Sequence, residues 1–154
     1  MTIKSIVIDS LSVPDFLGYN DRGTILCDNA IVWHDSLSCC PNPYQPSTGK
    51  KYRMAYGWVA PCSATFECWS SPKHGKSLKL NDLGPVPARY PDLSNGAPKM
   101  TCSAVEIHCG QNHDWRGSAA CITVDPGVWP SFIKFFEIGD KGQIAIIDKT
   151  GGVA

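Results

Sequence analysis

Short runs in which apolar and polar residues alternate recur along the whole chain. Glycine, proline and asparagine separate them, as is typical of strands joined by turns. The runs are KSIVIDSL (4–11), GTILCD (23–28), AIVWHD (30–35), YRMAYGWVA (52–60), TFECWS (65–70), SLKLND (77–82), SAVEIHC (103–109), CITVD (121–125) and QIAIID (143–148). The pattern predicts a mostly β protein.

One segment, DPGVWPSFIKFFEIGD (125–140), has the periodicity of a helix instead. Pro130 suits a first helical turn and Gly139 suits a stop. We expect this helix, in the C-terminal half, to pack on the sheet. Two further segments, 39–51 and 81–100, are rich in proline, glycine and polar residues, and we predict that both are long loops.

The 154 residues fit a single domain, 1–154, that is large enough to bury a core. The formal net charge is zero and the chain has no block of basic residues, which argues against nucleic acid as a partner. No run approaches the length of a membrane span, so membrane insertion is not expected. The first residues lack the uninterrupted apolar stretch of a secretory signal, so we expect synthesis in the cytoplasm without a signal peptide.

Eight cysteines are many for a protein of a reducing compartment. Their even number allows structural disulfides, and their apolar surroundings equally allow buried thiols. No pair has the CxxC spacing of a zinc ribbon. The sequence leaves both alternatives open.

The segment EIHCGQNHDWRGSAACITV (106–124) holds two histidines and two cysteines between two predicted strands. A shared metal ion fits this spacing poorly, because the adjacent His108 and Cys109 point to opposite faces of a strand. His34 and His74 do not complete a ligand set, so the sequence predicts neither a metal nor another cofactor.

A cysteine nucleophile fits the segment better. His108 ends one strand and Cys121 begins the next, so neighbouring strands would bring them to the same end of the sheet. A nearby imidazole lowers the pKa of a cysteine, and Cys121 is therefore expected to be the most reactive thiol. The small residues at 117–120 allow the backbone before Cys121 to approach a substrate, with N–H groups directed at an oxyanion.

The residues IHCGQ, followed by GSAACITV, resemble the catalytic domain of the L,D-transpeptidases. That family's signature is a strand bearing a histidine, a loop, then Ser-His-Gly-Cys and an apolar strand. Ser118 matches the serine, Cys121 the nucleophile and His108 the base, whereas Ala119 and Ala120 stand where the signature has histidine and glycine. Thr123 replaces the usual basic residue.

The following VWPSFIKFFEIGDKGQIAIID resembles the family's next helix and closing strand. The resemblance covers 52–148, is specific over 105–148, and is nearest to small phage-type relatives. It implies an L,D-transpeptidase-like β-sandwich or barrel with one helix in the C-terminal half.

The resemblance also implies a cysteine-dependent hydrolase or transferase acting on the stem peptides of bacterial peptidoglycan. Cys121 would attack the substrate carbonyl, His108 would act as the base, the Cys109 backbone carbonyl would orient the imidazole, and the Ala120 N–H would bind the oxyanion. Substrate would lie against the preceding loop, at His113, Trp115, Arg116, Gly117 and Ser118, with Arg116 pairing with a carboxylate.

A protein made without a secretory signal would reach the wall through an opening made by another protein, as a phage lysis protein or an injected effector does. Two alternatives remain. One is a catalytically silent wall-binding or virion structural module of the same fold. The other is a small zinc protein that uses His108, His113 and cysteines.

Overall fold

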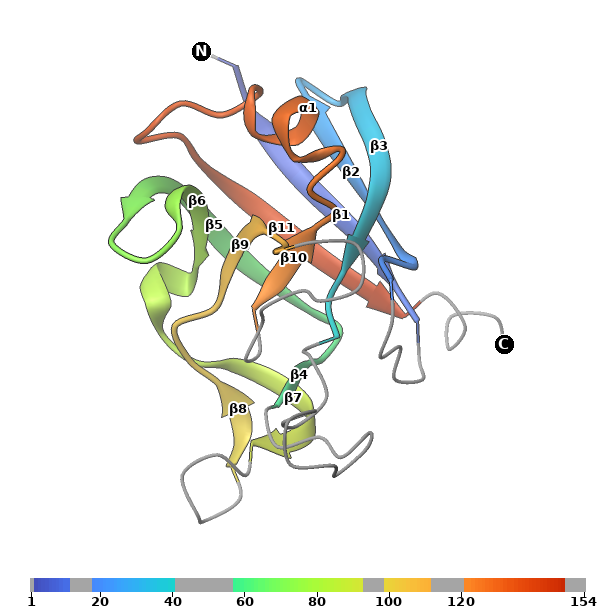
Figure 1. Cartoon of the computed structure of the whole chain (residues 1–154), viewed down its shortest axis with the longest axis vertical. Coiled ribbons are helices and arrows are strands. Elements are labelled where there is room, and N and C mark those ends of the chain that lie inside the picture. The colour runs from blue at the N-terminus through green and yellow to red at the C-terminus, as the bar shows by residue number, and fades with distance from the viewer. Residues whose placement is uncertain (1, 12–17, 41–56, 93–98, 112–120, 149–154) are drawn as a thin grey trace.

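The computed structural model describes residues 2–11, 18–40, 57–92, 99–111 and 121–148. Eight strands form a closed barrel (Figure 1), which confirms the mostly β class. In barrel order they are β1 (Lys4–Ser10), β11 (Lys141–Asp148), β5 (Cys62–Ser71), β6 (Gly75–Leu80), β9 (Glu106–Cys109), β10 (Ile122–Val124), β3 (Ala30–Ser38) and β2 (Asp21–Cys27). Neighbouring strands are antiparallel except for β1 with β11 and β9 with β10, which are parallel.

Alternation along the strands fills the barrel, because successive side chains of a strand point to opposite faces. In β1, Ile6, Ile8 and Ser10 are buried, and in its parallel neighbour β11, Ile144 and Ile146 are buried. Ile6 and Ile144 are register partners. Fully or nearly fully buried side chains from the other strands complete the core, namely Ile25, Leu37, Phe66, Leu78, Leu80, Ile107, Ile122 and Val124.

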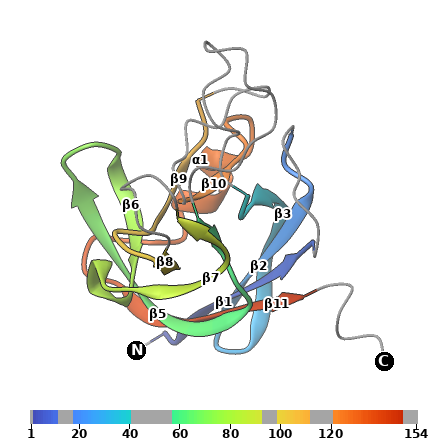
Figure 2. The same ribbon diagram turned by 90° about the horizontal axis from the view of Figure 1, so that it is seen from below.

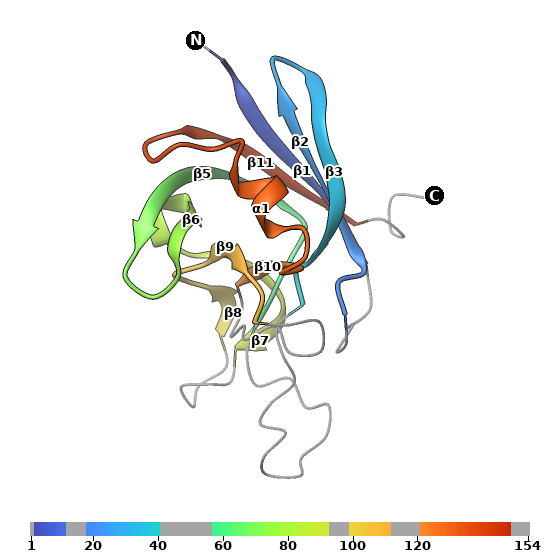
Figure 3. The ribbon, with the colours of Figure 1, turned by 45° about the horizontal axis from the view of Figure 1, so that its top comes forward.

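The helix α1 (Trp129–Ile133) is much shorter than the segment predicted to be helical. After Ile133 the chain continues in turns, and the N–H of Gly139, at φ +100, donates to the carbonyl of Cys68 at 2.8 Å. Phe136 is still fully buried, against Phe66. The apolar spacing that predicted a long helix thus marks one short helix and a turn that both face the core, between β3 and β5 (Figure 3).

A second sheet, of order β4–β7–β8, lies at one end of the barrel (Figure 2). It consists of β4 (Trp58–Val59), β7 (Val86–Asp92) and β8 (Lys99–Cys102), and the 3₁₀ turn η2 (Asn81–Leu83) precedes it. The prediction of a long loop over 81–100 is therefore wrong. Val86 and Ala88 are buried while Pro87 between them is exposed and accepts the N–H of Ala60, so these prolines do not prevent a strand.

All eight cysteines lie among the described residues and are thiols. The sequence left open disulfides or buried thiols, and the structure has thiols. Two of them, Cys39 and Cys68, are completely buried. Among the described parts of the chain, no helix is long and apolar enough to cross a membrane.

Candidate active site

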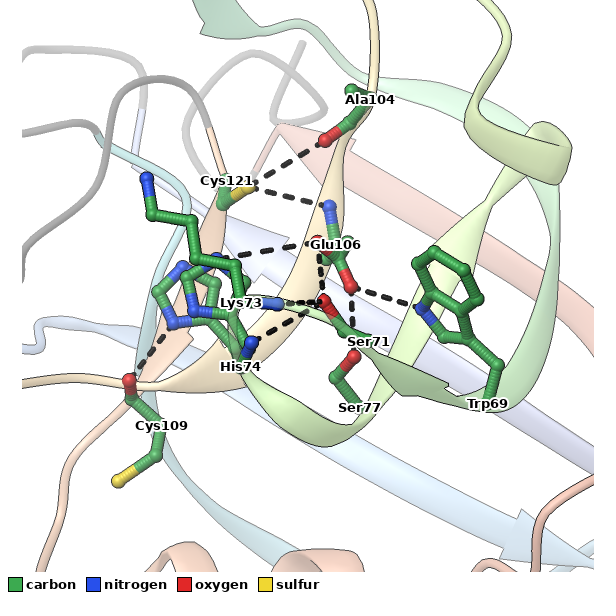
Figure 4. Close-up of polar contacts among 10 residues, drawn as sticks. Trp69, Ser71, Lys73, His74, Ser77, Ala104, Glu106, Cys109 and Cys121 are labelled. Carbon is green, nitrogen blue, oxygen red and sulfur yellow. Dashed lines mark hydrogen bonds and ion pairs between the residues drawn. The ribbon is translucent and has the colours of Figure 1, made fainter.

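The two residues singled out as a catalytic pair lie on adjacent parallel strands. His108 is on β9, and Cys121 immediately precedes β10, whose first residue Ile122 is the register partner of Ile107. The Cys121 sulfur, a ring nitrogen of His108 and a ring nitrogen of His74 all lie within 4.8 Å of one another. The pairing of these two parallel strands thus brings the thiol and the imidazole together. Figure 4 shows Cys121 and His74 at this site.

A backbone hydrogen bond fixes the His108 ring. Nδ1 lies 2.8 Å from the carbonyl oxygen of Cys109, and His108 is only 3% exposed. A carbonyl can only accept, so Nδ1 carries the proton and the neutral ring has its lone pair on Nε2. The Cys109 side chain turns away from the rings and its thiol donates to the carbonyl of Gly110. The backbone carbonyl predicted to orient the imidazole is therefore bonded to it.

The Cys121 thiol lies between two backbone groups of the chain that enters β9. The N–H of Glu106 donates to the sulfur at 3.4 Å, and the thiol donates to the carbonyl of Ala104 at 3.7 Å. Ala104 has φ +56, in the left-handed region that is unfavourable for a residue with a Cβ. A strained backbone conformation therefore lies next to the Cys121 sulfur, and such conformations are common at functional sites.

Burial determines the protonation states of the pair. It raises the pKa of Cys121 to about 11, although the Glu106 N–H lowers it, and it lowers the pKa of His108 to about 4, although the Cys109 carbonyl raises it. The pair is therefore an uncharged thiol and an uncharged imidazole near neutral pH. The expectation of a lowered Cys121 pKa is wrong, because withdrawal from water outweighs the neighbouring groups.

His74 is the member of the site that sequence reasoning missed. It lies in the turn at 72–74 between β5 and β6, where the N–H groups of Lys73 and His74 each donate to Ser71 Oγ at 3.3 Å. Its ring stacks on that of His108, with centroids 3.7 Å apart and planes 5° apart. The run SPKHG between two strand patterns signals a hairpin turn, but only the pairing of β6 with β9 brings that turn to His108.

A buried carboxylate, that of Glu106, lies beside His74. Glu106 is two residues before His108 on β9, hence on the same face, and is 7% exposed. Its oxygens accept hydrogen bonds from Trp69 Nε1 at 2.9 Å, Ser77 Oγ at 2.8 Å and Ser71 Oγ at 3.3 Å. Oε2 also lies 4.0 Å from Nε2 of His74. Trp69 is thus part of this network.

The other predicted site residues lie outside the described residues. These are the Ala120 N–H of the oxyanion site and the substrate-binding residues His113, Trp115, Arg116, Gly117 and Ser118. Their roles remain predictions. The described part of the site brings together a thiol, an imidazole and a carbonyl hydrogen-bonded to that imidazole, and it contains three side chains of types that can hold a metal ion.

Comparison of the chain with protein-family models, with curated proteins and with solved structures finds no significant match.

Proposed function

We propose that the protein is a cysteine-dependent enzyme of the L,D-transpeptidase type, acting on the stem peptides of bacterial peptidoglycan. The observation that carries the proposal is the His108 tautomer. Its Nδ1 is hydrogen-bonded to the Cys109 carbonyl, which leaves Nε2 as the basic nitrogen, and a ring nitrogen of His108 lies within 4.8 Å of the Cys121 sulfur. A nucleophile, a base and an orienting acceptor in this order form a catalytic triad.

In the proposed reaction, the Cys121 sulfur forms a bond to the carbonyl carbon while His108 Nε2 takes the thiol proton. Because both groups are uncharged at rest, proton transfer accompanies the attack. The tetrahedral intermediate then collapses, the C–N bond breaks, and His108 returns the proton to the departing amine. The product is a thioester on Cys121, which water or an acceptor amine releases.

The L,D-transpeptidase-like fold is also part of the proposal. It is supported by a mostly β barrel in which a histidine strand and a cysteine strand are parallel neighbours. A short helix, α1, follows the cysteine strand, and β11 then closes the barrel. This order of elements is the one that the resemblance implies.

We further propose that the enzyme hydrolyses rather than cross-links. A cross-linking enzyme must shield its thioester from water, which is always in excess. Only residues 109–120 separate the base from the nucleophile, so this connection offers little chain to cover the intermediate.

The test is to incubate the full chain with a tetrapeptide muropeptide and with a cross-linked dimer, and to follow the products by mass. Loss of a terminal residue or splitting of the dimer, abolished in Cys121→Ala and retained in the control Cys27→Ser, supports the proposal. New dimers as the main product contradict the hydrolytic assignment. No change in any fragment contradicts the enzyme and favours the catalytically silent module.

A further inference from the structure

We propose that His74, His108 and Cys121 together bind a Zn²⁺ ion, which blocks the thiol while it is bound. Two imidazole nitrogens and one thiolate are ligand types that zinc prefers, and a fourth position would remain for water. Because the Cys121 thiol is protonated near neutral pH, the Zn–S bond forms as the S–H bond breaks and the proton passes to solvent. The three side chains come from separate parts of the fold, namely the β5–β6 turn, β9 and the residue before β10. The sequence gives no sign of this set, because His74 is far from the other two along the chain.

The spacing is close to that of a zinc site. Zinc holds nitrogen at about 2.0–2.1 Å and sulfur at about 2.3 Å, so tetrahedral ligand atoms are roughly 3.4–3.6 Å apart. In this protein the three candidate atoms lie within 4.8 Å of one another. A contraction on the order of 1 Å therefore brings them into coordination distance.

The groups around the ligands match those that surround bound zinc. A ligating histidine usually donates its second ring N–H to a carbonyl or carboxylate, which fixes the ring and its tautomer. His108 makes this bond through Nδ1 to the Cys109 carbonyl. The Glu106 carboxylate, 4.0 Å from His74 Nε2, supplies negative charge beside a divalent cation. Its own position is held by Trp69 and Ser77.

One movement is required. The two rings are stacked with their planes 5° apart, so their in-plane lone pairs run side by side rather than converging on one point. His108 is buried and bonded, whereas the His74 side chain is 18% exposed and lies in a turn. Zinc binding should therefore tilt the His74 ring out of the stack while His108 stays in place.

Binding and catalysis exclude each other, because the ion takes the Cys121 sulfur and one nitrogen of the His108 ring. The inhibitory part of this inference rests on the proposed function, whereas the binding part does not. If the protein binds zinc at these residues but changes no muropeptide, the zinc-site proposal holds and the proposed enzymatic function is refuted. A protein whose turnover is unaffected by saturating zinc would overturn the blocking role.

The experiment is a calorimetric titration of the reduced full chain with ZnCl₂, comparing wild type, His74→Ala and Cys121→Ser with the matched controls His34→Ala and Cys27→Ser. We expect one ion per chain and at least a roughly 10-fold loss of affinity in the two site variants only. Co²⁺ in place of Zn²⁺ should give a thiolate charge-transfer absorption that disappears in Cys121→Ser. Circular dichroism checks that each variant is folded.

A measurement on the wild type alone avoids dependence on the variants. Zinc should protect Cys121 from alkylation, as seen by peptide mass, and leave the labelling of Cys27 unchanged. Equal affinities in all five proteins, or labelling of Cys121 that zinc does not alter, would overturn the proposal.

Discussion

Replacing Glu106 with alanine should destabilise the protein more than any exposed carboxylate substitution. The side chain accepts three hydrogen bonds from Trp69, Ser71 and Ser77, and Ser77 is completely buried. Glu106→Ala removes both acceptor oxygens, and with them all three hydrogen bonds, at once. The serine hydroxyls can turn towards other acceptors, but the Trp69 N–H is fixed by its ring.

The magnitude follows from these contacts. A buried donor left without an acceptor costs about 1–3 kcal/mol, and bonds to a charged group are at the upper end. One fixed donor, two adaptable hydroxyls and the cavity left by the side chain together give a loss of about 3–5 kcal/mol. Glu106→Gln keeps the shape and one oxygen acceptor, so it should cost only about 1–2 kcal/mol.

Equilibrium urea unfolding measures both values. Glu67→Ala is the matched control, because Glu67 has only a 3.9 Å ion pair with Lys79, of the kind that contributes less than about 1 kcal/mol. With a slope of about 2 kcal/mol per molar urea, Glu106→Ala should lower the midpoint by roughly 2 M. A midpoint within experimental error of that of Glu67→Ala would refute the inferred network.

Three further predictions concern stability. Folding lowers the pKa of His108 from 6.5 to about 4, so the unfolded chain binds more protons than the folded protein between these pH values. The free energy of unfolding should therefore rise with pH across this window, and about 3 kcal/mol of it is lost as pH falls through the window. His108→Gln should flatten this pH dependence in urea unfolding, and an equal dependence in wild type and variant would contradict the prediction. Gly142→Ala should lower the free energy of unfolding by more than about 2 kcal/mol, because its Cβ would overlap the Lys4 carbonyl of the neighbouring strand. The control Gly127→Ala should be tolerated, because its Cβ meets only a carboxylate oxygen at 3.4 Å. Similar melting temperatures for the two variants would contradict this prediction. Asp140→Ala should cost about 1–2 kcal/mol near neutral pH, since Asp140 accepts bonds from the Lys4 ammonium at 2.6 Å and from a backbone N–H at 2.8 Å. These bonds lower the Asp140 pKa below 3.8, so the difference from wild type should vanish as pH falls through the lowered value, and a difference independent of pH would argue against the ion pair.

The strands were predictable because alternation is a local property. Lys4–Ser10 and Lys141–Asp148 each turn one face towards the core, and the apolar residues on that face are visible in the sequence as an alternating pattern. The prediction of a loop at 81–100 is wrong because proline does not always interrupt a strand: β7 exposes Pro87 and buries Val86 and Ala88 on either side. The predicted helix failed after Ile133 because helical spacing cannot distinguish a helix from a turn that returns Phe136 to the core.

The site was predictable only in part, for a related reason. His108 and Cys121 are separated by a short crossover, so their meeting could be inferred from chain order. His74 and Trp69 meet β9 only because β6 pairs with it, and nothing local in the sequence specifies that pairing. The direction of the Cys121 pKa shift was missed because it depends on burial, which the whole barrel determines.

The measurement that tests the central claim most directly is the mass of the intact protein after acid quenching during turnover of a tetrapeptide muropeptide. The account predicts a transient gain equal to the acyl donor, removable by hydroxylamine as a thioester and mapped to Cys121. His108→Ala, in which the base is absent, should form this adduct on the order of 100- to 10,000-fold more slowly. Turnover with no adduct, an adduct on another residue, or activity that survives in Cys121→Ala would contradict the account.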